Sequence, residues 1–427
     1  MRFESVVRAL SRNDFKLALL VGAAVFLLEV AFLAPAPSSI DEDSMLAVSE
    51  SLVASQSFAV PAYLGAPGPD GQHFSRWYPL LSIVAMPTTA AGHAMAELLD
   101  LPGHYVAAVF GMVLSAGISA VCAAVVLLLG LQLGGTARAA VAAGAAFAFG
   151  TISVTYSRTF FAEPLLGLLT AIALLGALST SQTGQRIATA ASALCVLAKP
   201  AGIVIGPLLS AYLLLRKEPL HRALQPLAAS AAGLALYMGY NFHRFEDPLN
   251  FGQPTDFGVA GAGQAILGLL VSPGRGLFWY CPVVLALAGL GRLLWKRLEP
   301  ALIVAVALAY LGLHSLWAQW HGAWCWGPRF LLPALPGLLA LTALLTRVAW
   351  RRAFVALACA GFLVNAPMLF SSFKQYHAEA HEAGLPLEQF LWNLPDSPLV
   401  NAWGAAQRQV AAARATDVKD VVSASGV

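Results

Sequence analysis

The sequence predicts an all-α polytopic membrane protein with about 11 transmembrane helices. Of its 427 residues, 58% are hydrophobic and 11% are charged, and the mean hydropathy is +0.71. Soluble globular proteins contain roughly 25% charged residues, so this composition excludes an ordinary soluble domain. Apolar segments of about the length that crosses a bilayer recur along the chain, and most charged residues lie between them.

The first apolar segment, residues 17–34, follows a basic N-terminus. It ends before Pro35 and Pro37, because proline removes a backbone donor and cannot continue a helix. No small-residue cleavage site precedes Asp41, so we expect an uncleaved first span rather than a signal peptide. The apolar segments that follow are 104–130, 139–156, 162–180, 187–215, 224–240, 276–291, 301–318, 330–346 and 353–370.

The segment 187–215 is too long for one simple span. As a helix it would extend about 44 Å, compared with a hydrocarbon core of roughly 30 Å. A break at Lys199-Pro200 would give two short spans that return to the same side, with the broken backbone lining a cavity. In the alternative map, 187–215 is one tilted helix and 79–98 also crosses the membrane, although the prolines and polar residues of 79–98 look more interfacial than spanning.

Lysine and arginine place the N-terminus in the cytoplasm. With 11 spans, most of the 25 basic residues fall on the inner side and most of the 22 acidic residues fall outside. This predicts a multi-pass protein of the cytoplasmic (inner) membrane. Residues 1–371 would form the transmembrane module, with a first outer loop at 35–103 that carries surface-lying helices. Residues 372–427 would form an extracytoplasmic tail with a disordered end.

Three consecutive carboxylates, Asp41, Glu42 and Asp43, follow the first span. The residues after them favour a short helix along the membrane surface, with Ser39 or Asp41 as its N-cap. One interpretation is that these acids only cap that helix. A cap needs one such residue rather than three, so a catalytic carboxylate is the other interpretation.

Basic residues on the outer side break the positive-inside trend. Arg76, Arg275 and Arg329 each lie at the mouth of a predicted span. Guanidinium groups that face carboxylates there suit the binding of a phosphate while a base acts on a second substrate. The alternative is that these arginines extend toward lipid headgroups.

One outer loop is rich in tryptophan. Its indoles are those of an interfacial aromatic belt, or they bind sugar rings and isoprenoid chains. Glu29, within the first span, is either a functional group or the partner of a neighbour. The tryptophans of the loop are Trp317, Trp320, Trp324 and Trp326.

Several short motifs follow one another along the chain. They are Asp41-Glu42, Arg76-Trp77-Tyr78-Pro79-Leu80, Arg158 through Glu163-Pro164, Ala198-Lys199-Pro200, Asn241 through Gly252, Ser272-Pro273-Gly274-Arg275-Gly276 and Trp326-Gly327-Pro328-Arg329-Phe330. This order resembles bacterial type-C glycosyltransferases over approximately residues 38–345. These are integral-membrane enzymes related to protein O-mannosyltransferases and to the aminoarabinose transferase of lipid A.

The resemblance implies individual roles. Asp41 would be the catalytic base and Glu42 its catalytic neighbour, and the donor would be a polyprenyl-phosphate-linked sugar. The residues implied in substrate binding are Arg76, Tyr78, Arg158, Glu163, Lys199, Arg275, Trp326 and Arg329. No cofactor is implied with certainty. A divalent metal at an oxygen-rich site of Asp41, Asp43, Glu163 and His73 stays open.

The implied reaction is an inverting transfer to a hydroxyl group of an extracytoplasmic glycan, lipid or protein. The carboxylate would take the hydroxyl proton while basic groups stabilise the departing phosphate. No Gly-rich nucleotide-binding motif occurs in the sequence, as suits a lipid-linked donor, and membrane lipids rather than nucleic acid are the expected partners. Two other classes stay open: a transporter or flippase of a lipid-linked sugar, and a non-catalytic membrane assembly partner.

Overall fold

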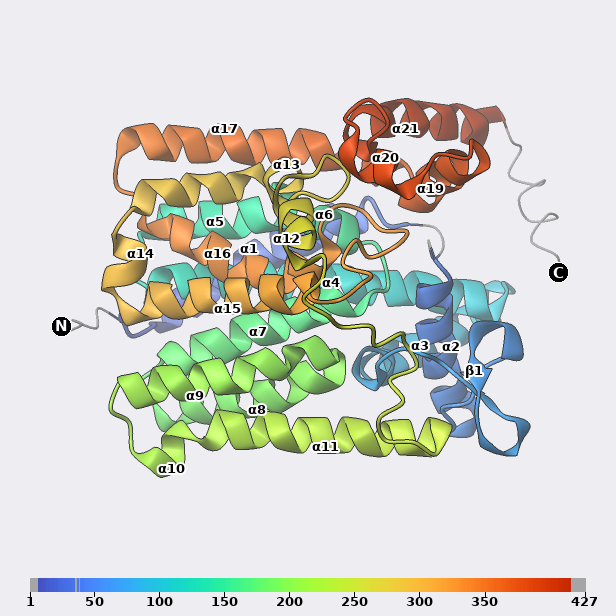
Figure 1. The fold of residues 1–427 in the computed structure, drawn as a ribbon, viewed down its shortest axis with the longest axis horizontal. Coiled ribbons are helices and arrows are strands. Elements are labelled where there is room, and N and C mark those ends of the chain that lie inside the picture. The colour runs from blue at the N-terminus through green and yellow to red at the C-terminus, as the bar shows by residue number, and fades with distance from the viewer. Residues whose placement is uncertain (1–6, 35–36, 38, 416–427) are drawn as a thin grey trace.

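The computed structural model describes residues 7–34, 37 and 39–415. Regular structure in these ranges is almost entirely helical (Figure 1), so the predicted all-α class is correct. Three helices are long and apolar enough to cross a membrane by length and composition: Gly103–Gln132, Leu298–Ser315 and Val348–Phe370. The total of 11 crossings stays a prediction.

A complete capping box starts the helix of the predicted first span. α1 (Arg12–Val30) follows Ser11, whose side chain accepts from the Asp14 N–H, while the Asp14 carboxylate accepts from the Ser11 N–H. These bonds satisfy two of the donors that a helix start leaves free. α1 therefore begins before the predicted start of the span at residue 17. The predicted stop at Pro35 lies outside the described residues.

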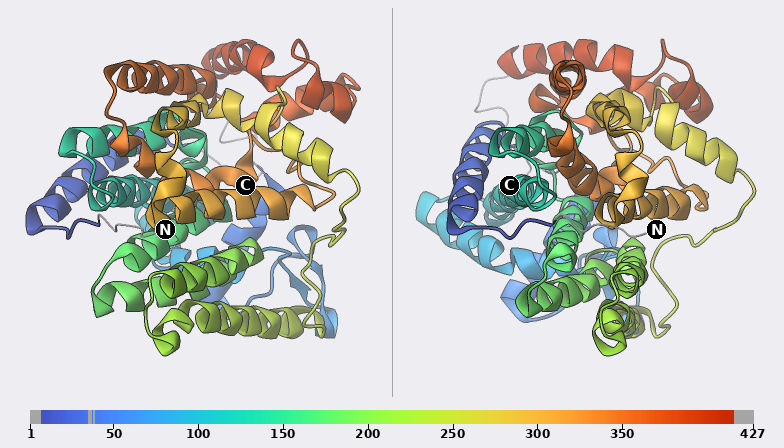
Figure 2. Two further views of the ribbon diagram at one scale, coloured as in Figure 1. Left: turned by 60° about the vertical axis from the view of Figure 1, so that its left-hand side comes forward. Right: turned by 90° about the vertical axis from the view of Figure 1, so that its left-hand side faces the viewer.

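The other apolar segments also form helices. Most of them run along the long axis of the molecule in Figure 1, and the right-hand view of Figure 2 looks down that axis. In chain order they are α4 (Gly103–Gln132), α5 (Ala137–Phe149), α6 (Ser153–Tyr156), α7 (Ala162–Leu178), α8 (Gln182–Ala198), α9 (Ile205–Leu215), α10 (Leu220–Ala223), α11 (Gln225–Phe245), α12 (Ala262–Val271), α13 (Leu277–Tyr280), α14 (Leu293–Lys296), α15 (Leu298–Ser315), α16 (Leu335–Leu341), α17 (Val348–Asn365) and α18 (Pro367–Phe370). Segments of 3-10 helix join several of them: η3 (Pro200–Val204), η4 (Pro282–Leu290), η5 (Arg329–Ala334) and η6 (Thr342–Leu344).

The predicted break at Lys199-Pro200 is confirmed. α8 ends at Ala198, η3 follows, and α9 packs back against α8. Gly202 lies where the chain reverses. A Cβ at this position would come within 2.3 Å of the Cys195 carbonyl oxygen, so a residue with a side chain would clash there. Beyond α9, Arg216 donates to the Ala177 carbonyl at 3.3 Å, so α9 returns to the end where α7 finishes. The alternative of a single tilted helix over 187–215 is therefore wrong.

Contacts of α7 assemble three chain segments at one point. α7 packs against α4, α8 and η5. Its first turn carries Glu163, the adjoining end of α8 is followed by Lys199, and η5 begins with Arg329. Three motifs that are far apart in the sequence thus meet.

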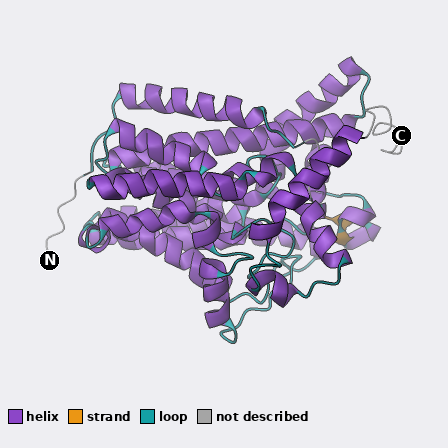
Figure 3. Ribbon diagram, turned by 90° about the horizontal axis from the view of Figure 1, so that it is seen from above, coloured by secondary structure: helices purple, strands orange, loops and turns teal. Residues whose placement is uncertain are grey.

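The first outer loop forms a compact unit across the end of the bundle. It contains α2 (Ile40–Ser55), η1 (Ala62–Leu64), β1 (Ala66–Pro67), η2 (Pro69–Gly71), β2 (His73–Phe74) and α3 (Pro79–Leu99). The strands pair antiparallel, with Ala66 opposite Phe74 and Pro67 opposite His73, and they form the small sheet of Figure 3. α2 runs across the ends of the long helices in Figure 1 and is joined to α3 by a 2.7 Å hydrogen bond between Ser49 and Thr89.

The two ends of the bundle differ in charge as predicted. In Figure 1, α2 and α3 lie at the end opposite to α10 and α14. α10 and α14 carry Arg222 and Lys296, whereas α2 carries the acidic run. Which end faces the cytoplasm stays a prediction from this charge difference.

Three further helices follow α18. These are α19 (Phe373–Glu382), α20 (Leu387–Trp392) and α21 (Pro398–Ala415). They pack together around Tyr376 and Phe390, and the Gly274 N–H donates to the Leu391 carbonyl at 3.0 Å. The tail thus lies against the outer loops. Disorder was predicted for about the last 15 residues; α21 continues to Ala415, and the rest of that stretch lies outside the described residues. The division at residue 371 stays a prediction.

Candidate active site

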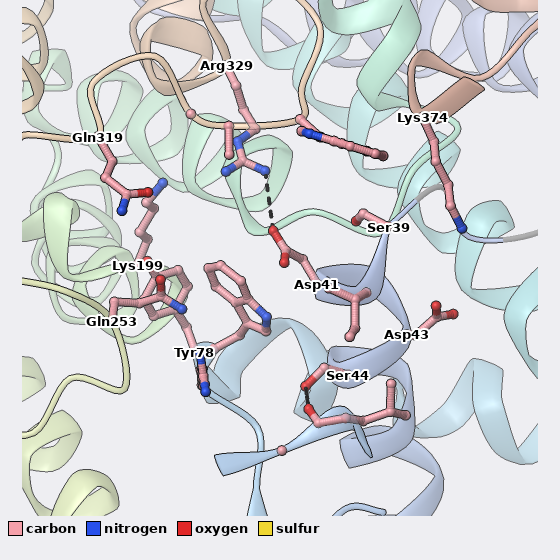
Figure 4. A pocket seen from close by; sticks show the side chains of 18 of the residues that line it. Ser39, Asp41, Asp43, Ser44, Tyr78, Lys199, Gln253, Gln319, Arg329 and Lys374 are labelled. Carbon is pink, nitrogen blue, oxygen red and sulfur yellow. Dashed lines mark hydrogen bonds and ion pairs between the residues drawn. The ribbon is translucent and has the colours of Figure 1, made fainter. Parts of the chain in front are cut away.

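A cavity of about 800 Å³ lies between the start of α2, η1, the loop before α3, the α8–η3 break, the loop that carries Gln253, the loop before η5 and the start of α19. Figure 4 shows most of its side chains, which converge from segments far apart in the sequence. The charged residues that line it are Asp41, Asp43, Arg76, Lys199, Arg329 and Lys374. Basic and acidic groups therefore face one cavity.

Asp41 and Arg329 point toward one another in this cavity (Figure 4). Asp41 Oδ2 lies 3.8 Å from Arg329 Nη1. Burial raises the pKa of the Asp41 carboxyl, and the Arg329 guanidinium acts in the opposite direction. The N-cap of α2 is Ser39, whose hydroxyl accepts from the Glu42 N–H. Because Ser39 caps the helix, Asp41 is left to face the cavity.

The Glu163 carboxylate forms ion pairs with two cations of this site, Lys199 and Arg329. Its Oε1 lies 2.6 Å from Lys199 Nζ and 3.4 Å from Arg329 Nε. All three side chains are at least nine-tenths buried, so the pairing offsets much of the cost of removing these charges from water. Two cations share one carboxylate here, which leaves positive charge to face Asp41 and the cavity.

The loop before α3 supplies one wall. Arg76 is exposed and Tyr78 is partly buried, and both line the cavity. Burial raises the pKa of the Tyr78 phenol, so it stays a hydrogen-bond donor at neutral pH. Gly252, at φ +69°, lies against Arg76: a Cβ there would come within 3.0 Å of the Arg76 backbone. A glycine is therefore needed to let the two loops meet.

Glu42 does not face the cavity. It is completely buried, and its Oε2 accepts from the Phe160 N–H at 2.7 Å while Ser39 Oγ donates to Oε1 at 3.2 Å. The carboxylate thus connects α2 with the loop before α7. The catalytic role expected for Glu42 stays a prediction, and this geometry does not favour it, because Oε2 accepts from the Phe160 loop and Oε1 accepts from Ser39.

Arg275 lies outside the cavity lining. Its guanidinium donates to three backbone carbonyls, those of Gly274 at 2.8 Å, His321 at 2.7 Å and Ala323 at 2.7 Å. Its side chain is 1% exposed. Arg275 therefore shapes the loop whose Ala323 and Trp324 line the cavity, rather than contacting a ligand there. The structure does not place Arg275 at the predicted donor contact, because the loop folds over this arginine.

Trp326 is a core residue. Its indole N–H donates to Asn365 Oδ1 at 2.7 Å, and its ring packs edge-on against Tyr280. The predicted substrate contact is therefore not made by this side chain. Two other tryptophans of the same loop, Trp317 and Trp324, do line the cavity.

Two further predicted residues lie elsewhere. Arg158 lines a separate cavity and donates to the Met368 carbonyl. Glu29 accepts a hydrogen bond from Ser119 Oγ at 2.8 Å within the bundle, so it pairs with a neighbour. Within the described ranges, no three His, Cys, Asp or Glu side chains are grouped to hold a metal ion, so the suggested set with His73 is not assembled.

Sequence reasoning missed Lys374 as a site residue. It belongs to α19 and lines the cavity beside Asp43 (Figure 4). Like the arginines at the span mouths, it is a basic residue predicted on the outer side, and that signal would have found it. Gln253 and Gln319 also line the cavity and carry no comparable signal.

The fold is similar to that of solved structures of ArnT, a type-C glycosyltransferase. No protein-family model matches the sequence. No curated protein matches it either.

The similar solved structures include two of ArnT from Cupriavidus metallidurans, one bound to undecaprenyl phosphate and one in the apo state. The bound structure aligns with a TM-score of 0.55 at 16% identity, over 94% of this chain and 77% of ArnT. The apo structure aligns with a TM-score of 0.53 at 18% identity, over 93% of this chain and 75% of ArnT. The archaeal oligosaccharyltransferase AglB from Archaeoglobus fulgidus aligns with a TM-score of 0.47 at 14% identity, over 91% of this chain and 61% of that chain. At these identities the likeness concerns the fold.

Proposed function

We propose that this chain is an inverting glycosyltransferase that moves a sugar from a polyprenyl-phosphate carrier to a hydroxyl group of an extracytoplasmic acceptor. The observation that carries the proposal is the position of Asp41. Its carboxylate lines the cavity and forms an ion pair there with Arg329 at 3.8 Å. A base beside cationic groups is the arrangement that such a transfer requires.

Asp41 acts as the general base. It takes the proton of the acceptor hydroxyl as the hydroxyl oxygen attacks the anomeric carbon, and the bond from that carbon to the phosphate oxygen breaks. Lys199 and Arg329 stabilise the negative charge that develops on the departing phosphate. Glu163 holds both cations in place, and a single displacement inverts the anomeric centre.

An adjoining apolar cavity suits the carrier chain. It has a volume of about 240 Å³, and it shares Tyr78, Lys199 and Trp317 with the first cavity. The rest of its lining is mostly apolar and includes Pro200, Ile203, Phe251, Phe257 and Leu313. An isoprenoid chain here would place its phosphate beside Lys199. The ArnT structure with undecaprenyl phosphate supports a carrier of this class.

The charge difference between the ends of the bundle supports the proposed orientation. With the basic end in the cytoplasm, the cavity opens on the extracytoplasmic face of the inner membrane. A lipid-linked sugar is available there without a soluble nucleotide donor. A transferase cleaves the lipid-linked sugar and forms a glycosylated acceptor, whereas a flippase moves the intact lipid-linked sugar across the membrane. The two activities can therefore be told apart by whether the donor is cleaved.

The experiment supplies purified protein in nanodiscs with a panel of polyprenyl-phosphate sugars and extracted envelope lipids and glycans. Release of polyprenyl phosphate together with a glycosylated product, both detected by mass spectrometry, is the expected result. Nucleotide sugars in the absence of a lipid carrier should give no product. Transfer from a nucleotide sugar alone would refute the proposal, as would translocation of the intact donor in proteoliposomes without any cleavage.

A further inference from the structure

A second cavity, of about 710 Å³, lies between the loop after α6 and the start of α19. The charged residues among its described lining are both cations, Arg158 and Lys374. Ser371, Ser372 and Gln409 add polar groups. The mechanism above uses neither this cavity nor Arg158.

Arg158 is a buried cation with no carboxylate partner among the described ion pairs. Its side chain is 9% exposed, Nη1 donates to the Met368 carbonyl, and Nε is buried without a hydrogen-bond partner in the described part of the chain. Burial lowers the pKa of Arg158 to about 10, so it remains charged at neutral pH. A buried charge is costly unless it is paired, so this site suits an anion.

An apolar groove of about 220 Å³ adjoins Arg158. Leu28 of α1, Phe32 just after that helix and Phe362 of α17 line it, and they remain 54%, 39% and 39% exposed. Glu29 also lines the groove, with its carboxylate accepting from Ser119. On a membrane protein, such a groove is open to lipid chains.

Lys374 connects the two cavities, because it lines both. In Figure 4 it lies at the edge of the first cavity beside Asp43, with Asp41 further in. Lys374 therefore borders both the cavity beside Arg158 and the cavity that Asp41 faces. The donor cavity beside Lys199 lies on the other side of Asp41.

We propose that the second cavity binds the acceptor, and that this acceptor is a lipid that carries a phosphate group. Arg158 and Lys374 contact the phosphate, the groove of Leu28, Phe32 and Phe362 takes a chain, and a hydroxyl group of the lipid head reaches Asp41. The assignment rests on the proposed function and names its acceptor class. Polyprenyl phosphate has the same anionic chemistry, and the test below separates the two sources.

The first test measures lipid binding without catalysis. Full-length protein in detergent is titrated with phosphatidylglycerol, or with phosphatidylcholine of the same chains, and retained lipid is counted by native mass spectrometry. We expect selective retention of phosphatidylglycerol. Loss of a charge-assisted contact should weaken it about ten- to hundredfold in Arg158→Gln and in Lys374→Gln. Lys374 is exposed, so its variant tests the site even if Arg158→Gln fails to fold.

Arg408→Gln is the matched control. Arg408 is an exposed arginine of α21 that pairs with Glu379 at 2.6 Å and lines neither cavity. Its variant should retain phosphatidylglycerol as the wild type does. Equal retention in Arg158→Gln, Lys374→Gln and the control would overturn the proposal.

The second test separates acceptor from carrier. Undecaprenyl phosphate should bind equally well to wild type and Arg158→Gln, because its site lies beside Lys199. Weaker binding of undecaprenyl phosphate in Arg158→Gln, with phosphatidylglycerol unaffected, would make the cavity a carrier site and refute the inference. If lipid binding depends on Arg158 but the protein cleaves no donor, the anionic lipid site is supported and the transferase proposal is refuted. If the protein cleaves the donor but lipid binding does not depend on Arg158, the transferase proposal is supported and the lipid site is refuted.

Discussion

Asp41 Oδ2 and Arg329 Nη1 lie 3.8 Å apart, although one residue follows the first span and the other begins η5. This separation is longer than the roughly 2.7–2.9 Å of a charge-assisted hydrogen bond. Arg329 instead places its Nε 3.4 Å from Glu163. Arg329 therefore stabilises the charge of Asp41 without occupying its oxygens, and Asp41 can still accept a proton.

Asp41→Asn should lower turnover by about a hundred- to ten-thousandfold, the usual contribution of a general base. Folding should be preserved, because Ser39 rather than Asp41 caps α2. The measurement is single-turnover cleavage of the lipid-linked donor, with donor binding assayed alongside. Asp43→Asn, the neighbouring carboxylate that faces Lys374, should stay near wild type. Equal losses in the two variants would remove the assignment of Asp41 as the base.

The pH dependence of turnover should report the Asp41–Arg329 pair. Asp41 must be ionised to act as a base, so activity should fall as the pH drops through its pKa. Burial raises that pKa and Arg329 lowers it, so Arg329→Gln should move the acidic limb of the kcat profile to higher pH. Arg329→Lys, which keeps the charge, should move the limb less. An acidic limb at the same pH in Arg329→Gln would contradict the coupling.

Glu42→Ala should destabilise the protein rather than act on the chemical step. Removing the carboxylate leaves the buried Phe160 N–H without its acceptor, which costs about 1–3 kcal/mol. Thermal unfolding in detergent should show a lowered Tm, while the variant that remains folded keeps much of its turnover. If Glu42→Gln reduced turnover more than Asp41→Asn at unchanged Tm, Glu42 would be the base.

Arg275→Ala should loosen the outer loop while leaving donor affinity within a fewfold of wild type. Its guanidinium donates to the carbonyls of His321 and Ala323, and the Cys325 thiol, a weaker donor, also reaches the His321 carbonyl at 3.5 Å. Hydrogen exchange over residues 321–325 should accelerate in the variant. Strong loss of donor binding with unchanged exchange would restore the direct phosphate contact expected from the sequence.

Acid should release the C-terminal helices. Burial, together with Arg275, lowers the pKa of His377 to about 3, compared with about 6.5 in an unfolded chain. A detached tail binds the proton more readily, so the docked state is fully stabilised above about pH 6.5 and loses stability as the pH falls toward 3. Limited proteolysis after residue 371 should therefore increase between pH 7 and pH 5. His377→Gln should abolish this pH dependence, and an unchanged dependence would implicate another group.

Local chemistry made much of the fold predictable. The break in 187–215 rests on a proline and on a length mismatch, both of which are visible in the sequence. The acidic run stood out because charged residues are scarce in this chain, and Arg329 stood out because a basic residue on the outer side breaks the positive-inside trend. These features do not depend on how the helices pack against one another, so they can be recognised from the sequence without a structure.

The sequence by itself determined an all-α membrane protein, its broken helix and a set of charged residues on one side, because composition, proline and charge act locally. The tertiary structure decided which charges meet. Adjacent residues of a helix lie about 100° apart, so packing α2 against the Phe160 loop turns Glu42 inward and leaves Asp41 in the cavity. Similarly, an arginine has the same charge whether it faces a ligand or a backbone carbonyl. Loop folding buried Arg275 and left Arg329 beside Asp41, because only the three-dimensional path of the backbone determines which acceptors are near.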